Sequence, residues 1–477
     1  MSEPGQKVRR RLLLYGLAAA LAAGVLLLPR FLPRLTPALK TRNLIAEADA
    51  VMKTEAVERL QELLRIDSSN PPGDTRAAIL GLARLFDCEG IPGEIVGDDP
   101  TRPILVARLR GLTEDGALLL LNHVDVVPPE DLSKWDRPPF SGERGSGRAG
   151  HYLYGRGALD MKAQIIAGFL AMADLKRRGV VPRRDIVFVA ESAEESFELQ
   201  YGIGWVLERR PDLLAGVTDA VNEGGVNEVL GSGIVRYGIE VLQKAIVSVW
   251  IDAPTPGPLE AFRKFLEEKD RSSPLHLDPT VKEFLRFIAP TRSDVWGRSM
   301  LGSGESILGP KLLREIPEVY RSLLRDAIYA GSIGPAPGGG FTFRAVRMLL
   351  PGSPVKANHD ELLGWAKERG LRTREHLVTY DAVASPATGR AWDALTAVFG
   401  LDAFEPAPVG IYILNGAFTS SPFLRARGRR VFGISPFNIN FYDASKIHNA
   451  NERISLPHYV EGVERFRAFV AEYALAP

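Results

Sequence analysis

Residue types that commonly bind metals stand at the end of an apolar run in the segment LLLLNHVDVV. The run ends at His123, and Asp125 follows two residues later. Both side chains therefore lie on the same side of an extended chain. A histidine that binds a metal commonly has a carboxylate at its other ring nitrogen. The alternative is a capping or surface pair, so this segment indicates a metal ligand only in combination with others.

Acidic residues stand beside two further apolar patterns. Asp160 directly precedes the helical pattern MKAQIIAGFLAM, where a helix cap is the alternative. Glu194 and Glu195 follow the apolar strand pattern IVFVA, where a solvated acidic turn is the alternative. Because neighbouring side chains diverge, one of this pair is suited to bind a metal and the other to act as a base on metal-bound water.

Glu223 in DAVNEGG and His448 in YDASKIHNANERI complete the candidate set. The chain has a single cysteine, Cys88, so any metal must be held by histidines and carboxylates. Cys88 lies in the apolar-periodic stretch AILGLARLFDCEG, and we expect it to be buried and without chemical function. Open α/β sheets present ligand sites beyond their strand ends, which is where most of these segments fall.

Helical and strand patterns alternate along much of the chain, which predicts an α/β sheet with covering helices. The expected helices cover 46–66, 75–89, 161–178 and 456–475, and the expected strands cover 104–108, 117–121 and 185–189. The pattern of helical and strand segments changes between about 238 and 385, where we expect a smaller inserted α+β domain. The catalytic domain would then be discontinuous, with parts at 46–237 and 386–477.

Composition and charge exclude few functions. The 477 residues are 45% hydrophobic and 25% charged, as in a folded protein of two or three domains. The formal net charge of +1 gives no basic field, so nucleic acid is a poor first guess for a partner.

The N-terminus resembles a targeting segment. Basic residues at 7 and 9–11 precede an uncharged apolar run from Leu12 to Leu28. The run is just long enough to span a membrane. We predict a signal anchor within residues 1–35 and an extracytoplasmic catalytic body, on the periplasmic or secretory side. A cleaved export signal and a buried helix are the alternatives.

Taken together, the segments resemble the di-zinc metallopeptidase family that includes aminoacylase, acetylornithine deacetylase, glutamate carboxypeptidase and carboxypeptidase S. The most specific matches are WDRPPFSG (Trp135 to Gly142) and YGRGALDMK (Tyr154 to Lys162). The resemblance extends from about residue 50 to the C-terminus. It implies a zinc-exopeptidase-like α/β sandwich with a mixed sheet, interrupted by a ferredoxin-like lid.

The resemblance also implies two zinc ions, or another divalent metal such as cobalt or manganese, bridged by Asp160. His123 and Glu223 would complete one metal site, and Glu195 and His448 the other. Asp125 would orient His123, and Glu194 would act as general base and acid. Asn451 and Glu452 match a family pair that we interpret as supporting or substrate-side residues.

The inserted region departs from the family pattern. The family's lid histidine, which helps to bind the developing oxyanion, is missing after KAIVSVWID, and GPAPGGG replaces the Asn-Val-x-Pro segment. Arg347 sits one residue too early in RMLLPG, and TSSP (Thr419 to Pro422) stands where relatives have a TDSR-like stretch. Loss of one oxyanion donor reduces rate by on the order of 10² to 10³.

We therefore expect a zinc-dependent hydrolase of amide bonds in peptides or N-acyl amino acids, with an altered lid. One alternative is a catalytically silent zinc-binding surface protein whose lid binds a partner. Another is a hydrolase of a carbamoyl or lactam C–N bond. Relatives often form dimers through the lid. Because the lid sequence of this chain is unusual, the sequence does not decide whether it forms a homodimer.

Overall fold

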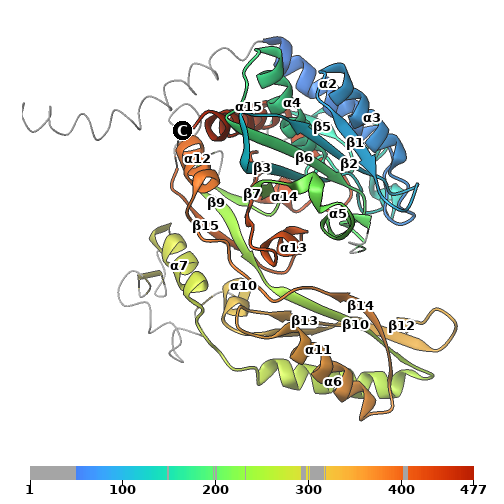
Figure 1. Cartoon of the computed structure of the whole chain (residues 1–477). Coiled ribbons are helices and arrows are strands. Elements are labelled where there is room, and N and C mark those ends of the chain that lie inside the picture. The colour runs from blue at the N-terminus through green and yellow to red at the C-terminus, as the bar shows by residue number, and fades with distance from the viewer. Residues whose placement is uncertain are drawn as a thin grey trace, which may run out of the picture.

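A nine-stranded mixed sheet forms the centre of the larger part of the molecule (Figure 1). The computed structural model describes residues 50–147, 150–196, 198, 201–230, 233–291, 297–298, 300, 316, 318–400 and 407–476. The strand order is β1-β2-β6-β3-β7-β16-β9-β15, with β8 paired to β9. The strands are β1 (Gly93–Val96), β2 (Ile104–Leu109), β3 (Thr113–His123), β6 (Arg184–Glu191), β7 (Val217–Asn222), β8 (Val226–Leu230), β9 (Gly233–Gln243), β15 (Val409–Leu414) and β16 (Arg430–Gly433).

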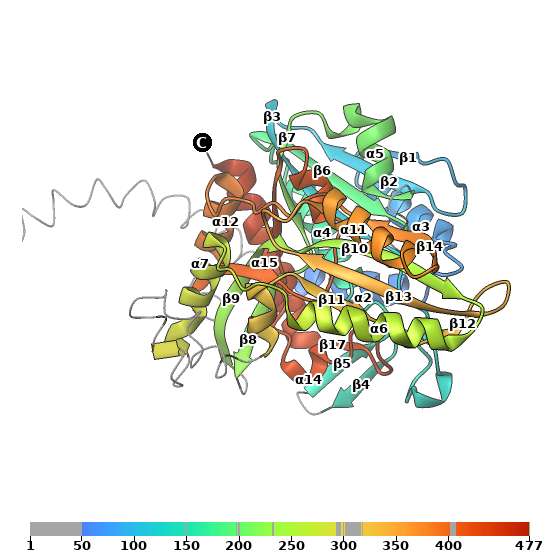
Figure 2. The same cartoon turned by 90° about the horizontal axis from the view of Figure 1, so that it is seen from below.

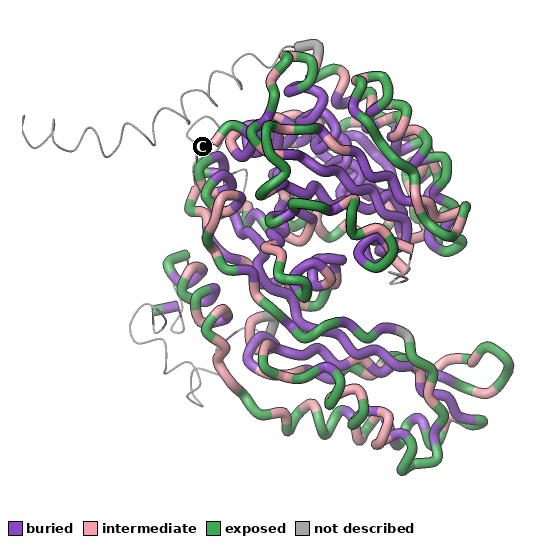
Figure 3. The backbone as a smooth tube through the Cα atoms, viewed as in Figure 1, coloured by how far each residue is buried: buried purple, intermediate pink, exposed green. Residues whose placement is uncertain are grey.

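The central strands are parallel and buried on both faces. β3 pairs in parallel with β6 on one side and with β7 on the other. Along β3, Leu118 and Leu120 pack into one apolar cluster, and Leu119 and Leu121 pack into another on the opposite face. This double burial explains why the strand sequences are continuous apolar runs, and Figure 3 shows these strands as buried.

Helices cover the two faces of this sheet. Buried residues of a first group of helices pack into the large apolar cluster, and buried residues of two short helices pack into the cluster on the opposite face. The first group is α2 (Ala50–Leu64), α3 (Arg76–Cys88), α4 (Lys162–Arg177), α12 (Arg390–Phe399) and α15 (Leu456–Leu475). The second group is α5 (Ile203–Arg209) and α13 (Ser421–Arg425). The architecture is the mixed α/β fold that the sequence predicts.

A smaller antiparallel sheet follows β9 directly, with the order β11-β13-β10-β14 and β12 paired to β13. Its strands are β10 (Ala245–Ala253), β11 (Ala327–Ala330), β12 (Gly334–Pro335), β13 (Phe341–Leu349) and β14 (Arg372–Val378). Helices α6 (Pro256–Arg271) and α11 (Val355–Lys367) cover one face (Figure 2). This sheet lies within the stretch expected to be inserted. The domain boundaries themselves stay a prediction.

The remaining elements surround the two sheets. A three-stranded sheet pairs β17 (Arg453–Ser455) with β5 (Gly150–Tyr154) and β5 with β4 (Arg144–Gly147). The other helices are α7 (Pro279–Ile288), α10 (Glu318–Arg321) and α14 (Phe441–Ala444). Because β17 lies far along the chain from β5, this small sheet brings the residues around position 450 close to those around position 155.

The prediction that Cys88 is buried is wrong, because its side chain is exposed. The buried residues of α3 include Leu82 and Phe86, which lie four residues apart and share one helix face. Cys88 lies two residues beyond Phe86 and therefore points to the opposite face. The apolar periodicity of the segment was correct, but it did not include this position.

The predictions of a membrane anchor and an extracytoplasmic body are corrected. Within the described part of the chain, no helix is both long enough and apolar enough to cross a membrane. The 20-residue helix α15, for example, contains Glu461, Glu464 and Arg465. The run from Leu12 to Leu28 lies outside the described residues.

Candidate metal centre

Three of the predicted segments meet at one edge of the main sheet. Strands β6, β3 and β7 are parallel neighbours, so their carboxyl ends lie side by side. His123 is the last residue of β3, and Glu223 directly follows β7. Glu194 and Glu195 lie in the turn after β6. Topology therefore brings together residues that are up to 100 positions apart in the sequence, as is typical of ligand sites on parallel sheets.

Asp160 lies between two imidazole rings. Its Oδ1 is 3.1 Å from Nε2 of His123, and its Oδ2 is 2.9 Å from Nε2 of His448. On the outer side, Nε2 of His123 is 3.2 Å from a carboxylate oxygen of Glu223. Nε2 of His448 is 3.3 Å from a carboxylate oxygen of Glu195. The order across the site is thus carboxylate, histidine, carboxylate, histidine, carboxylate.

The loop that positions Asp160 is held by the buried carboxylate of Glu452. This carboxylate accepts hydrogen bonds from the backbone N–H of Leu159 at 2.8 Å and of Gly157 at 3.1 Å. It also accepts a 2.7 Å hydrogen bond from the guanidinium of Arg156, which is itself buried. Glu452 therefore supports the loop, and among the described residues its hydrogen bonds go to that loop and to Arg156.

Asp125 has a different geometry from the expected one. Nδ1 of His123 donates to the backbone carbonyl of Asp125 at 2.9 Å, whereas the nearest carboxylate oxygen of Asp125 is 3.6 Å away. The carboxylate accepts the backbone N–H groups of Glu194 at 3.3 Å and Glu195 at 3.1 Å, and the side-chain amide of Asn70 at 3.0 Å. It therefore connects the end of β3 to the acidic turn.

The two glutamates of that turn have unsatisfied oxygen atoms. Oε1 of Glu194 and Oε1 of Glu195 are buried and have no hydrogen-bond partner among the described residues. A buried carboxylate without a partner is unfavourable unless a further group completes it. Two sets of ligand atoms fall within 4.8 Å of one another, which are His123 with Glu194 and Glu223, and His123 with Asp160 and Glu195.

Crowding of these groups shifts their pKa values. Burial and the negative charge of Asp160 raise the pKa of Glu223 to about 8, and they also raise the pKa of Glu195. Burial raises the pKa of Glu194 well above its ordinary value. A hydrogen bond to Asp160 raises the pKa of His448 to about 10. Divalent cations would relieve this accumulation of negative charge, so the donor set fits a metal site made of nitrogen and oxygen ligands.

The candidate metal centre opens into a cavity of about 490 Å³. Its polar lining residues include Asp160, Glu194, Glu195, Glu223 and His448. Its apolar lining residues include Phe418, Phe437 and Ile439. A mostly apolar cavity with a few convergent charged groups is typical of sites that bind small molecules.

A sequence model of Peptidase family M20/M25/M40 matches residues 119–472, which is more than half of the chain. The chain belongs to this peptidase family. The resemblance found in the sequence is thereby confirmed, and the family identifies the enzyme class, metallohydrolases of amide bonds.

Individual M20 relatives match over part of their length. A succinyl-diaminopimelate desuccinylase of Wolbachia sp. subsp. Brugia malayi is 38% identical over 161 residues, 33% of this chain and 38% of the relative. A carboxypeptidase S-like protein of Dictyostelium discoideum is 39% identical over 92 residues, 19% of this chain and 17% of the relative. The chain thus spans at most about two fifths of the length of these curated relatives.

A solved structure confirms the fold. An M20 metallo-carboxypeptidase of Sulfolobus solfataricus superimposes with a TM-score of 0.65 at 18% identity, covering 88% of this chain and 99% of that chain.

All seven predicted site residues of the M20 chain lie at the carboxyl edge of the main sheet or on the loops beside it. The prediction assigned no role to Asn70 and Arg156, which hold Asp125 and Glu452. Asn70 lies in a segment that was interpreted as a helix breaker, and Arg156 lies in the motif YGRGALDMK without a role of its own.

Proposed function

We propose that this M20 chain is a metal-dependent hydrolase of amide bonds in N-acyl amino acids or peptides. Two Zn²⁺ ions, or other divalent ions such as Co²⁺ or Mn²⁺, would occupy the centre. The proposed ligands are His123, Asp160 and Glu223 for one ion, and Asp160, Glu195 and His448 for the other.

The arrangement of Asp160 is the observation that supports this proposal most strongly. One carboxylate has each of its oxygens within 3.1 Å of a different imidazole nitrogen. Each imidazole also faces an outer glutamate, at 3.2 and 3.3 Å. A purely structural ion-pair network would not require two such half-sites that share a bridging carboxylate, whereas a pair of metal ions does.

Glu194 is the proposed general base. When bound, the two ions would supply Lewis-acid polarisation of the scissile carbonyl and lower the pKa of water at the centre. Glu194 lines the cavity, and its buried Oε1 has no partner among the described residues. It is therefore free to accept a proton from the attacking water and to deliver it to the leaving amine. Asp125 would hold the Glu194 backbone in position.

The substrate proposal rests on the relatives as well as on the cavity. One relative is named a desuccinylase and the other a carboxypeptidase S-like protein, and both names describe the removal of an acyl group or a terminal residue. The cavity of about 490 Å³ has room for a small amide substrate. Pairing of two chains through the smaller sheet stays a prediction.

Hydrolysis by the full zinc-loaded chain tests this proposal, with a pool of N-acyl amino acids and dipeptides as substrates. We expect amine release that disappears in Glu194→Ala while zinc binding is kept. Glu198→Ala is the matched control, since Glu198 follows in the same turn but pairs with Arg102 outside the centre. Zinc binding without any turnover in the wild-type chain would contradict the proposal and favour a catalytically silent metal-binding protein.

A further inference from the structure

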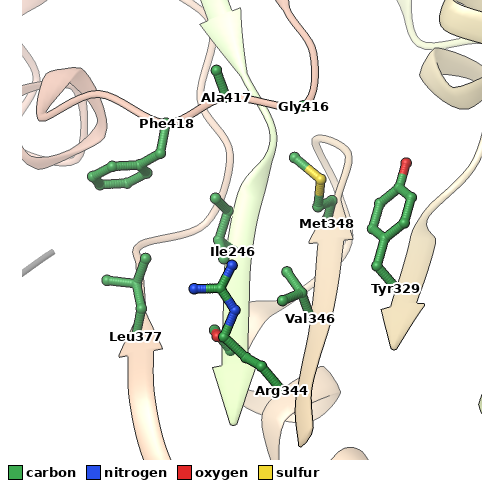
Figure 4. A pocket seen from close by; sticks show the side chains of 10 residues that line it. Ile246, Tyr329, Arg344, Val346, Met348, Leu377, Gly416, Ala417 and Phe418 are labelled. Carbon is green, nitrogen blue, oxygen red and sulfur yellow. The ribbon is translucent and has the colours of Figure 1, made fainter. Parts of the chain in front are cut away.

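Two stretches of chain that follow strands of the main sheet line the cavity of the metal centre. After β15, the loop of residues 416–418 lines this cavity and also a second space of about 400 Å³ on the smaller sheet (Figure 4). After β16, the segment 434–439, which we call the β16 wall, contributes Ile434, Ser435, Phe437 and Ile439. Three of these four side chains are apolar, so the β16 wall presents mostly hydrocarbon to a bound molecule.

Buried polar side chains hold the β16 wall in place. The side-chain amide of Asn227, buried on β8, donates to the backbone carbonyl of Ser435 at 2.8 Å and to that of Phe437 at 2.9 Å. The buried guanidinium of Arg465 on α15 donates to the backbone carbonyl of Pro436. Because these carbonyls already have protein donors, the conformation of the wall is set by the fold and not by a ligand.

The described residues that line the cavity offer no free charge to a charged group of the substrate. None of them is a lysine or an arginine. Their carboxylates all belong to the proposed metal ligands or to the proposed base, Glu194. Besides the ligand His448, the uncharged polar lining residues are Gln164, Thr419 and Ser435. A carboxylate or an ammonium group against the β16 wall would therefore lose its hydration without gaining an ion pair.

This absence of charge determines which half of an amide substrate fits the β16 wall. The amino-acid half of an N-acyl amino acid carries a carboxylate, and the first residue of a dipeptide carries an ammonium group. An uncharged acyl group carries neither. We propose that the β16 wall binds the acyl half of the substrate and selects N-acyl amino acids with an apolar acyl group over dipeptides and dicarboxylic acyl derivatives. The inference rests on the proposed amide hydrolysis and narrows its substrate class.

Four alanine derivatives test this selectivity with the full zinc-loaded chain. N-(4-methylpentanoyl)-alanine carries the apolar acyl group, and N-acetyl-alanine lacks four of its carbons. N-succinyl-alanine has a carboxylate in place of the terminal isopropyl group, and leucyl-alanine adds only an ammonium group to the 4-methylpentanoyl skeleton. These pairs therefore change acyl length or one charge at a time.

The expected order follows from burial and charge. Each buried methylene contributes about a fourfold gain, so kcat/KM for the 4-methylpentanoyl probe should exceed that for the acetyl probe by on the order of a hundredfold. The succinyl and leucyl probes should fall at least about tenfold below the 4-methylpentanoyl probe. A kcat/KM for either charged probe that equals or exceeds that for the 4-methylpentanoyl probe would overturn the proposal.

A lysine introduced into the β16 wall tests where the acyl group lies. Ile439→Lys supplies the missing cation, so kcat/KM for N-succinyl-alanine should rise by about tenfold, while that for the 4-methylpentanoyl probe should fall. Ile95→Lys is the matched control, because Ile95 is 42% exposed on β1 and does not line the cavity. Changes of equal size and direction for both probes in Ile439→Lys would overturn the assignment of the acyl half to this wall.

Asn227 is a positioning residue for the wall, since its amide binds the wall's backbone. Asn227→Ala should reduce kcat/KM for the 4-methylpentanoyl probe by about tenfold and leave that for the shorter acetyl probe within about twofold. Asn358→Ala is the matched control, because the amide of Asn358 donates to Pro354 beside α11 and does not line the cavity. An equal loss for both probes in Asn227→Ala would contradict this role.

Binding separates this inference from a failure of the proposed function. Calorimetry with zinc-loaded Glu194→Ala measures the affinity for all four probes without turnover. We expect the tightest binding for N-(4-methylpentanoyl)-alanine, whether or not the wild-type chain hydrolyses it. Tighter binding of the succinyl or leucyl probe, or no binding of any probe, would overturn the inference. The expected order of affinities without wild-type turnover would contradict only the proposed hydrolysis.

Discussion

The carboxylate of Asp125 accepts the backbone N–H of Glu195 at 3.1 Å. This hydrogen bond ties the end of β3, which carries His123, to the turn that carries Glu194 and Glu195. The buried Asp125 thus acts mainly on the backbone of the acidic turn, and its carbonyl fixes the ring of His123. The side chain of Asp125 therefore positions the acidic turn after β6, while its backbone carbonyl orients His123 at the end of β3.

Asp125→Ala should therefore weaken metal binding without removing a ligand. Loss of a residue that orients metal ligands typically reduces metal affinity or activity by about 10- to 100-fold. Competition between the chain and a chromophoric zinc chelator measures the change. Asp136→Ala serves as control, because Asp136 donates a hydrogen bond to Asn451 through its backbone N–H, which the substitution leaves in place. Unchanged zinc affinity in Asp125→Ala would contradict the positioning role.

Glu452→Gln should reduce the free energy of unfolding strongly. Arg156 and Glu452 are both buried and paired, and removal of one buried charge leaves the other uncompensated. The expected loss is about 3–5 kcal/mol. Urea unfolding of the zinc-loaded chain measures it. Glu114→Gln, which removes an exposed partner of Arg110, should change stability by less than about 1 kcal/mol, and a similar small change in Glu452→Gln would contradict this account.

Zinc affinity should rise with pH. In the metal-free chain, the pKa values of Glu223 at about 8 and His448 at about 10 keep both groups protonated at neutral pH. Because ligands bind in their deprotonated forms, metal binding releases these protons. Affinity should therefore increase by at least about tenfold per pH unit between pH 6 and 8. Titrations at three pH values check this, and an affinity independent of pH would be inconsistent with these ligands.

Lys244 should make the stability of the chain depend on pH in the alkaline range. It lies between β9 and β10, and burial lowers the pKa of Lys244 to about 8. An unfolded lysine titrates at about 10.4, so between these values the unfolded chain binds more protons and the free energy of unfolding rises with pH. The gain over Lys244→Met should reach up to about 3 kcal/mol. Urea unfolding of both chains at pH 8 and 10.5 measures it, and a constant difference would refute it.

Much of the centre could be predicted because its residues follow apolar strands directly. His123 is the last residue of β3, Glu223 directly follows β7, and Glu194 lies in the turn after β6. The helix of residues 456–475 was predicted with its observed bounds. In such cases local sequence determines both the element and the position of the functional group relative to it.

Other features depend on contacts that sequence pattern does not reveal. The carboxylate of Asp125 binds backbone N–H groups about 70 positions away, and Glu452 supports a loop that precedes it by almost 300. Cys88 falls at a helix end, where apolar periodicity alone could not determine the face. Ile246, Met348 and Phe418 pack together although they come from three separate segments, which are two paired strands and a loop.

Stepwise zinc addition to the metal-stripped full chain, with amide hydrolysis measured at each step, tests the central claim most directly. We predict that activity reaches its maximum at two zinc ions per chain. Asp160→Ala should lose high-affinity zinc and activity together, while Glu194→Ala should bind two zinc ions and remain inactive. Saturation of activity at one ion, full activity in the metal-stripped chain, or activity in Glu194→Ala would contradict a bridged two-metal centre that uses Glu194 as its base.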